Sequence, residues 1–244
     1  MNLDTIIKNG EVIDGTGQLR YKADIGISEG RIKSIGDLSG KEANQIIDAT
    51  NLIVSPGFID MHSHSDMCLF DDPGGDSKAF QGVTTEVTGN CSYSPFPRGL
   101  SDTPGVRLGW KYTWGEWTDL NGWSEQLKSH GISINVAPQL GQSALQESVG
   151  AVNEQPVTTD QMVAMKSLAC EAMEQGAFAI STGLNLAPSG YMSTSEIVDL
   201  CKEIRRYNGA FYTTHARVGP GKQISAIEEA ITIGREAEIP VQFS

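Results

Sequence analysis

The chain of 244 residues has few cysteines, no long apolar run and no cluster of basic residues. Its 4 cysteines are widely spaced, which favours free thiols in a reducing compartment over a disulfide framework. No apolar run approaches the ~18 residues that a membrane span requires, and the first residues lack a secretory signal. With 18 Lys and Arg against 30 Asp and Glu, the formal net charge of −12 argues against a nucleic-acid partner. We therefore expect a soluble, cytoplasmic protein that binds neither nucleic acid nor membranes.

Short strands and tight turns dominate the first 56 residues. Residues 24–27 and 31–35 alternate apolar and polar side chains around a turn at 28–30, and residues 5–13 are rich in β-branched side chains. The Asn9-Gly10 pair within the latter segment predicts a hairpin turn. We predict a small β-sandwich domain over residues 1–56.

From residue 57 onward, predicted strands alternate with predicted helices. Helical periodicity follows capping signals at residues 158–160 and 193–196, and it recurs over residues 224–237. Repeated strand–helix units without a Gly-rich nucleotide loop favour an α/β fold of the TIM-type (β/α) barrel over a Rossmann sheet. About six of the eight units are present over residues 57–244, and we expect the barrel to be truncated in strand six. The predicted strands are 58–62, 84–88, 132–137, 177–181, 211–214 and 240–243.

Two histidines follow the first of these strands. His62 and His64 are separated by one residue, so an extended backbone places both imidazoles on the same side. A histidine pair at the carboxyl end of a barrel strand is suited to a divalent transition metal, and active sites of TIM barrels lie at that end. The alternative interpretation is a pair of surface histidines near a turn.

Cys91 ends the next predicted strand, 29 residues after His62, which is about one βα repeat. A thiolate at that position can bind zinc and bridge two ions, whereas the alternative is a buried structural cysteine. His215 closes a later strand and is a candidate further ligand. Arg217, two residues on, could pair with a substrate carboxylate or form a surface salt bridge.

Five segments together resemble the amidohydrolase superfamily, and within it the N-acyl-D-amino-acid deacylases (D-aminoacylases). The segments are PGFIDMHSHSD (56–66), QGVTTEV (81–87), GNCSYSP (89–95), STGL (181–184) and THAR (214–217). The similarity extends over essentially the whole chain, which resembles the N-terminal portion of the family. It implies zinc-dependent hydrolysis of an N-acyl-D-amino acid to a carboxylate and a free D-amino acid.

The resemblance also implies roles for individual residues. His62 and His64 match one part of the family's metal site, and Cys91 and His215 match ligands of the tighter zinc position. Tyr191 matches a tyrosine that contacts substrate, and Arg217 matches the arginine after the histidine. A further metal-binding histidine and the general-base aspartate are expected beyond residue 244. The family often has a histidine, an arginine and an acidic residue where this sequence has Gln142, Gln146 and Val218.

Two other functions are consistent with the sequence. One is an amidohydrolase that acts on a cyclic amide, as hydantoinases and dihydropyrimidinases do, although the fourth strand end lacks their metal-bridging lysine. The other is an inactive fragment or pseudoenzyme that binds a partner through its open sheet edge.

Overall fold

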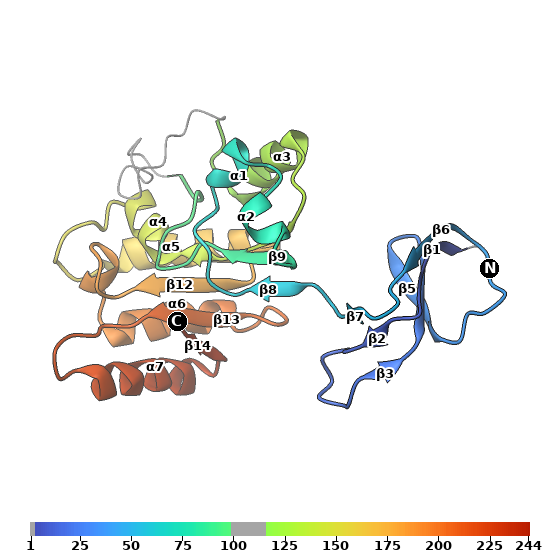
Figure 1. Cartoon of the computed structure of the whole chain (residues 1–244). Helices are drawn as coiled ribbons and strands as arrows, with labels where there is room; N and C mark the ends of the chain where they lie inside the picture. Colours follow the sequence, from blue (N-terminus) through green and yellow to red (C-terminus); the bar gives the residue numbers. More distant parts are fainter. Residues whose placement is uncertain (1–2, 99–115) are drawn as a thin grey trace. The chain divides into compact units, whose positions relative to one another are not determined.

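The computed structural model describes residues 3–98 and 116–244, and the chain divides into two compact units, Met1–Gly57 and Phe58–Ser244 (Figure 1). The sequence between Pro95 and Trp123 is rich in Gly, Pro and Trp, and most of it lies outside the described residues. The chain is a mixed α/β protein with several sheets.

Two small sheets build the first unit. One has the strand order β5-β4-β1-β6 and the other the order β3-β2-β7. The turn at residues 28–30 joins β4 to β5 as an antiparallel pair, as the sequence predicts. Leu3, Ile6 and Leu38 form a buried apolar cluster. The strands are β1 (Leu3–Lys8), β2 (Glu11–Val12), β3 (Tyr21–Lys22), β4 (Asp24–Ser28), β5 (Arg31–Gly36), β6 (Ala43–Asp48) and β7 (Ile53–Val54).

The hairpin prediction at Asn9-Gly10 is wrong. β1 pairs with β4 and β6, whereas β2 pairs with β3 and β7, so the turn passes the chain from one sheet to the other. Asn9 has a positive φ of 66°, and its side-chain amide donates to Asp48 while its backbone N–H donates to Asp24. These side-chain bonds stabilise the turn without the strand pairing that a hairpin requires.

The strands of the second unit are parallel and follow one another in chain order. Their sheets have the orders β10-β9-β8 and β11-β12-β13-β14, and only Gln139 separates β10 from β11. The backbone N–H of Phe178 donates to the Pro138 carbonyl at 2.9 Å, which links the two sheets at this junction. The strands are β8 (Phe58–Asp60), β9 (Val83–Thr88), β10 (Asn135–Pro138), β11 (Leu140–Gly141), β12 (Ala179–Gly183), β13 (Phe211–His215) and β14 (Val241–Phe243).

Helices alternate with these strands along the chain (Figure 1). Thr158 and Ser193 each form a capping box, in which the side chain accepts a backbone N–H and the third helical residue bonds back. Both helices thus begin where the sequence predicts. The helices are α1 (Cys68–Asp71), α2 (Asp76–Ala79), α3 (Leu120–His130), α4 (Gln142–Ser148), α5 (Thr159–Glu174), η2 (Ser189–Tyr191), α6 (Thr194–Ile204) and α7 (Gln223–Ala237).

The core of the second unit lies between the strands and the apolar faces of these helices. Leu140, Ile180 and Tyr212 from the strands and Met165 and Leu200 from the helices are fully buried in one cluster. Because the strands are parallel, their carboxyl ends meet at one edge of the unit. The segments that follow β8, β9 and β13 are therefore brought to the same place.

Candidate metal centre

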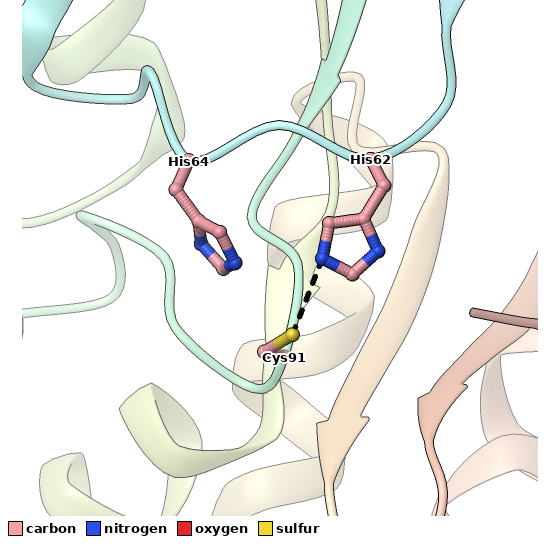
Figure 2. A group of neighbouring side chains, drawn as sticks. All are labelled: His62, His64 and Cys91. Carbon is pink, nitrogen blue, oxygen red and sulfur yellow. Dashed lines mark hydrogen bonds between the residues drawn. The ribbon is translucent and has the colours of Figure 1, made fainter.

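His62 and His64 lie in the segment that follows β8. The backbone N–H of His62 donates to the Asp60 carboxylate at 3.1 Å, which stabilises the turn out of the strand. The two imidazole rings meet edge to face with their centroids 5.3 Å apart. Figure 2 shows both rings extending from this segment toward Cys91.

Cys91 lies three residues after β9 and completes a three-residue cluster. Its Sγ is 3.3 Å from Nε2 of His62, and the potential ligand atoms of His62, His64 and Cys91 all lie within 4.8 Å of one another (Figure 2). His215, at the end of β13, brings Nδ1 to 3.6 Å from the same sulfur, although it is 124 residues away in the sequence. The four residues that the sequence predicts as ligands are therefore neighbours.

The Cys91 turn has an unusual backbone. Cys91 and Ser92 have positive φ angles of 53° and 73°, which L-residues rarely adopt. Two glycines allow the turn to lie against the neighbouring strands. A Cβ at Gly141 would lie 2.3 Å from the Ser92 carbonyl oxygen, and one at Gly183 would lie 2.6 Å from that of Cys91. Sequence reasoning missed these glycines, because their role depends on contacts between strands.

Hydrogen bonds fix the same turn from two elements. The backbone N–H of Ser92 donates to Oγ of Ser181 at 3.2 Å, and Oγ of Ser143 donates to Oγ of Ser92 at 2.8 Å. All three serines are buried. The position of the Cys91 thiol is consequently set by β12 and α4 as well as by its own strand.

The electrostatics of the cluster favour uncharged side chains. Burial, and then the nearby His215, lower the pKa of His62, while burial and the other two histidines lower the pKa of His64. Burial likewise raises the pKa of the Cys91 thiol. Neutral imidazole is the form that binds a metal ion.

The donor set fits a transition metal. Imidazole nitrogens together with one thiol sulfur are ligands that zinc binds well. In the part of the chain that the structure describes, Nδ1 of His64 is buried yet has no hydrogen-bond partner. A buried polar atom without a partner is costly, and coordination of an ion in this cluster is one way to offset that cost.

Beside the cluster lies a buried acidic group that sequence reasoning missed. Glu86 is fully buried; it accepts a hydrogen bond from Ser65 and lies 3.5 Å from the Lys78 ammonium, which also pairs with Asp60. Asp66 is fully buried as well, and burial raises its pKa to about 7. Asp66 follows His64 by two residues, so its position next to the histidine pair was the sequence feature that could have identified it as part of the site.

The two predicted substrate-binding residues are neighbours in the structure. Tyr191 ends η2 and is 37% exposed. The Arg217 guanidinium donates to the backbone carbonyls of Gly190 at 2.5 Å and Met192 at 2.9 Å, so it binds the chain on both sides of Tyr191. It also lies 3.4 Å from the Glu229 carboxylate. Arg217 therefore stabilises the turn that carries Tyr191, and contact of either residue with a substrate stays a prediction.

Gln142 and Gln146, where the sequence departs from the deacylase pattern, bind the same turn through residues Ser189 and Pro188. Both are buried. Gln142 accepts a hydrogen bond from Ser189, and Nε2 of Gln146 donates to the Pro188 carbonyl at 3.2 Å. Val218, the third departure, is 40% exposed.

Comparison with known proteins agrees with this architecture. The family model described as "Amidohydrolase family" matches residues 45–129. D-aminoacylase of Alcaligenes xylosoxydans xylosoxydans is 35% identical over 99% of this chain and 50% of its own length. A solved D-aminoacylase structure superposes with a TM-score of 0.91 at 36% identity, over 99% of this chain and 51% of the other. The chain is thus similar to D-aminoacylases along almost its whole length, and part of it matches the amidohydrolase family model.

Another solved structure that is similar to this chain carries a metal. N-acyl-D-glutamate deacylase of Bordetella bronchiseptica was solved with zinc and a phosphonate inhibitor that mimics the tetrahedral intermediate. It is 33% identical to the present chain with a TM-score of 0.90, over 99% of this chain and 51% of the other. The L-hydantoinase of Arthrobacter aurescens is 18% identical with a TM-score of 0.65, over 99% of this chain and 52% of the other, and thus shares the fold alone.

The chain spans about half the length of the curated relatives that it matches. Among the described residues, no helix has both the length and the apolar character needed to cross a membrane.

Proposed function

We propose that this chain supplies the metal-binding part of a zinc-dependent deacylase, which hydrolyses the amide bond of N-acyl-D-amino acids to a carboxylate and a free D-amino acid. The observation that carries the proposal is the convergence of His62, His64 and Cys91 within 4.8 Å, with His215 beside the thiol. The similarity to D-aminoacylase over 99% of the chain supports the choice of substrate class.

The chain's own residues would hold the ion and the substrate. His62, His64, Cys91 and His215 would bind the metal through imidazole nitrogens and the thiolate. Bound zinc supplies a Lewis acid and a water molecule of lowered pKa. Tyr191 and Arg217 would bind the substrate carboxylate, for which the planar guanidinium is well suited. We further propose that the general base is an aspartate beyond residue 244.

The finer architecture is part of the same proposal. The first unit would be the N-terminal part of a β-sandwich domain, and the second would be six units of an eight-unit barrel. Among the described strands, β8 and β14 each pair on one side only. Phe58 on β8 is 62% exposed and Phe243 on β14 is 48% exposed, as expected of side chains that further strands would cover. We also propose that the enzyme is soluble and cytoplasmic and acts on a small-molecule substrate.

Metal binding tests the site directly. Cys91→Ala should abolish tight zinc binding, because it removes the sulfur that lies beside both His62 and His215. Cys68→Ala is the matched control, since Cys68 is an exposed thiol outside the cluster. The measurement is the zinc content and zinc dissociation constant of the purified chain and its variants. Stoichiometric, tight zinc in Cys91→Ala would contradict the site.

Turnover tests the substrate class. N-acetyl-D-methionine, N-acetyl-D-glutamate and a hydantoin should be compared as substrates of a form that includes the residues beyond 244. We expect hydrolysis of the acylated D-amino acids and none of the hydantoin. Preference for the hydantoin would favour the cyclic-amide alternative, and a zinc-bound protein without turnover would favour the pseudoenzyme.

A further inference from the structure

A line of buried hydrogen bonds joins the strands and segments that carry the proposed metal ligands. Oγ1 of Thr213 donates to Oε1 of Gln139 at 2.5 Å, and Nε2 of Gln139 donates to Oδ1 of Asn90 at 3.1 Å. Nδ2 of Asn90 then donates to the carbonyl of Val87 at 2.8 Å and to that of Ser63 at 3.3 Å. The side chains of Thr213, Gln139 and Asn90 are all at most 1% exposed.

The line touches every segment that carries a proposed ligand. Thr213 lies on β13, two residues before His215. Asn90 is the residue before Cys91, and Ser63 is the residue between His62 and His64. The last link is reinforced by the backbone, because the N–H of Ser63 donates to the same Val87 carbonyl at 3.1 Å.

The direction of these bonds is fixed from the carbonyl end of the line. The carbonyls of Ser63 and Val87 can only accept, so Asn90 must present its NH₂ group to them. Its oxygen then faces Gln139, which must donate, and the Gln139 oxygen in turn faces the Thr213 hydroxyl. No amide in the line can flip without placing two acceptors or two donors together in a buried site.

The backbone around Gln139 adds a close contact. Gly89, just before Asn90, has a positive φ of 78°, and a Cβ there would lie 2.2 Å from the Gln139 carbonyl oxygen. Gln139 thus contacts the segment that leads into Cys91 through its main chain as well as its side chain.

We propose that Gln139, Asn90 and Thr213 are positioning residues, which set the separation of His62, His64, Cys91 and His215 through one directional hydrogen-bond line. The inference rests on the proposed metal centre. None of the three residues needs to touch the ion. They act on the backbone next to its ligands, and ligands held at the right separation bind a metal more tightly because less order is lost on binding.

Two substitutions at Thr213 test the positioning role with little change of side-chain shape. Thr213→Val removes the hydroxyl with little change of shape, and Thr213→Ser keeps the donor. We expect Thr213→Val to weaken zinc binding at least about tenfold and Thr213→Ser by less than about threefold. Gln139→Met breaks the next link without a large change of volume and should weaken zinc binding at least as much.

A control separates positioning from general stability. Gln146 is also a buried amide, bonded to the carbonyls of Ala151 and Pro188 and not to the line. Gln146→Met should lower the melting temperature as Gln139→Met does, yet leave zinc affinity within about threefold of the parent chain. In cobalt-loaded protein, Thr213→Val should also weaken the thiolate-to-cobalt charge-transfer band per bound ion, while Gln146→Met should not.

The outcomes are distinguishable. Unchanged zinc affinity and cobalt spectra in Thr213→Val and Gln139→Met would overturn the positioning role and leave the metal centre intact. Equal losses in Gln146→Met would also overturn it, since the effect would then follow stability. A parent chain without Cys91-dependent zinc binding would overturn the proposed centre together with this inference.

Discussion

Replacing Asp66 by asparagine should stabilise the metal-free protein, and by more at higher pH. Asp66 is fully buried, and burial raises its pKa from 3.8 to about 7, with the nearby Glu86 charge adding to the rise. Neither carboxylate oxygen has a hydrogen-bond partner of ordinary geometry among the described residues. The groups facing it are Glu86, the Thr88 side chain, the Gly89 backbone and the Cys68 thiol.

The direction in which the free energy of unfolding changes with pH follows from proton binding by Asp66. Between 3.8 and about 7 the folded state keeps the Asp66 proton while the unfolded chain has lost it, so the free energy of unfolding falls as pH rises. Each pH unit in that window costs about 1.4 kcal/mol, and the fall stops above the folded pKa. From about pH 5 to about pH 8, the advantage of Asp66→Asn should therefore grow by about 3 kcal/mol.

Urea unfolding with a chelator present measures this difference. Trp117 and Trp123 are buried in the core of the second unit, so their fluorescence reports on the unit that contains Asp66. Asp71→Asn, at the exposed end of α1, is the matched control for an Asp-to-Asn change in the same segment. An advantage of Asp66→Asn that is equal at both pH values, or larger at the lower one, would refute the reasoning.

Two further predictions concern the backbone. Gly183→Ala should cost about 1–3 kcal/mol of stability and weaken zinc binding, because its Cβ would meet the Cys91 carbonyl oxygen at 2.6 Å. Thermal unfolding and zinc titration measure the two effects. A variant with unchanged stability and zinc affinity would show that the Cys91 turn can move away from the added methyl group. Ser193→Ala should cost about 1 kcal/mol, since it removes the side chain that caps α6 and bonds Glu196. Chemical unfolding with Ser195→Ala as the control measures it, and equal losses in the two variants would count against the cap.

Local signals in the sequence were sufficient for six strands and for helices α5, α6 and α7 of the second unit, and they identified the ligand candidates. Thr158 and Ser193 begin helices through bonds to residues three positions away, so a few neighbouring residues carry the information. Parallel strands bring their carboxyl ends to one edge, which is why histidines and a cysteine at three strand ends could be predicted to meet. The same reasoning failed at Asn9-Gly10, because the partners of β1 and β2 lie elsewhere in the chain.

Only the tertiary structure determined the relative positions of the predicted metal ligands. The 3.6 Å approach of Cys91 to His215 spans 124 residues, and it depends on strand register and on the space that Gly141 and Gly183 leave. Gln139 carries no motif, yet it links the segments of two ligands through bonds to Asn90 and Thr213. The sequence by itself determined which side chains can bind a metal, since that chemistry belongs to each residue. Their separation depends on contacts between distant segments, which exist only once the chain has folded.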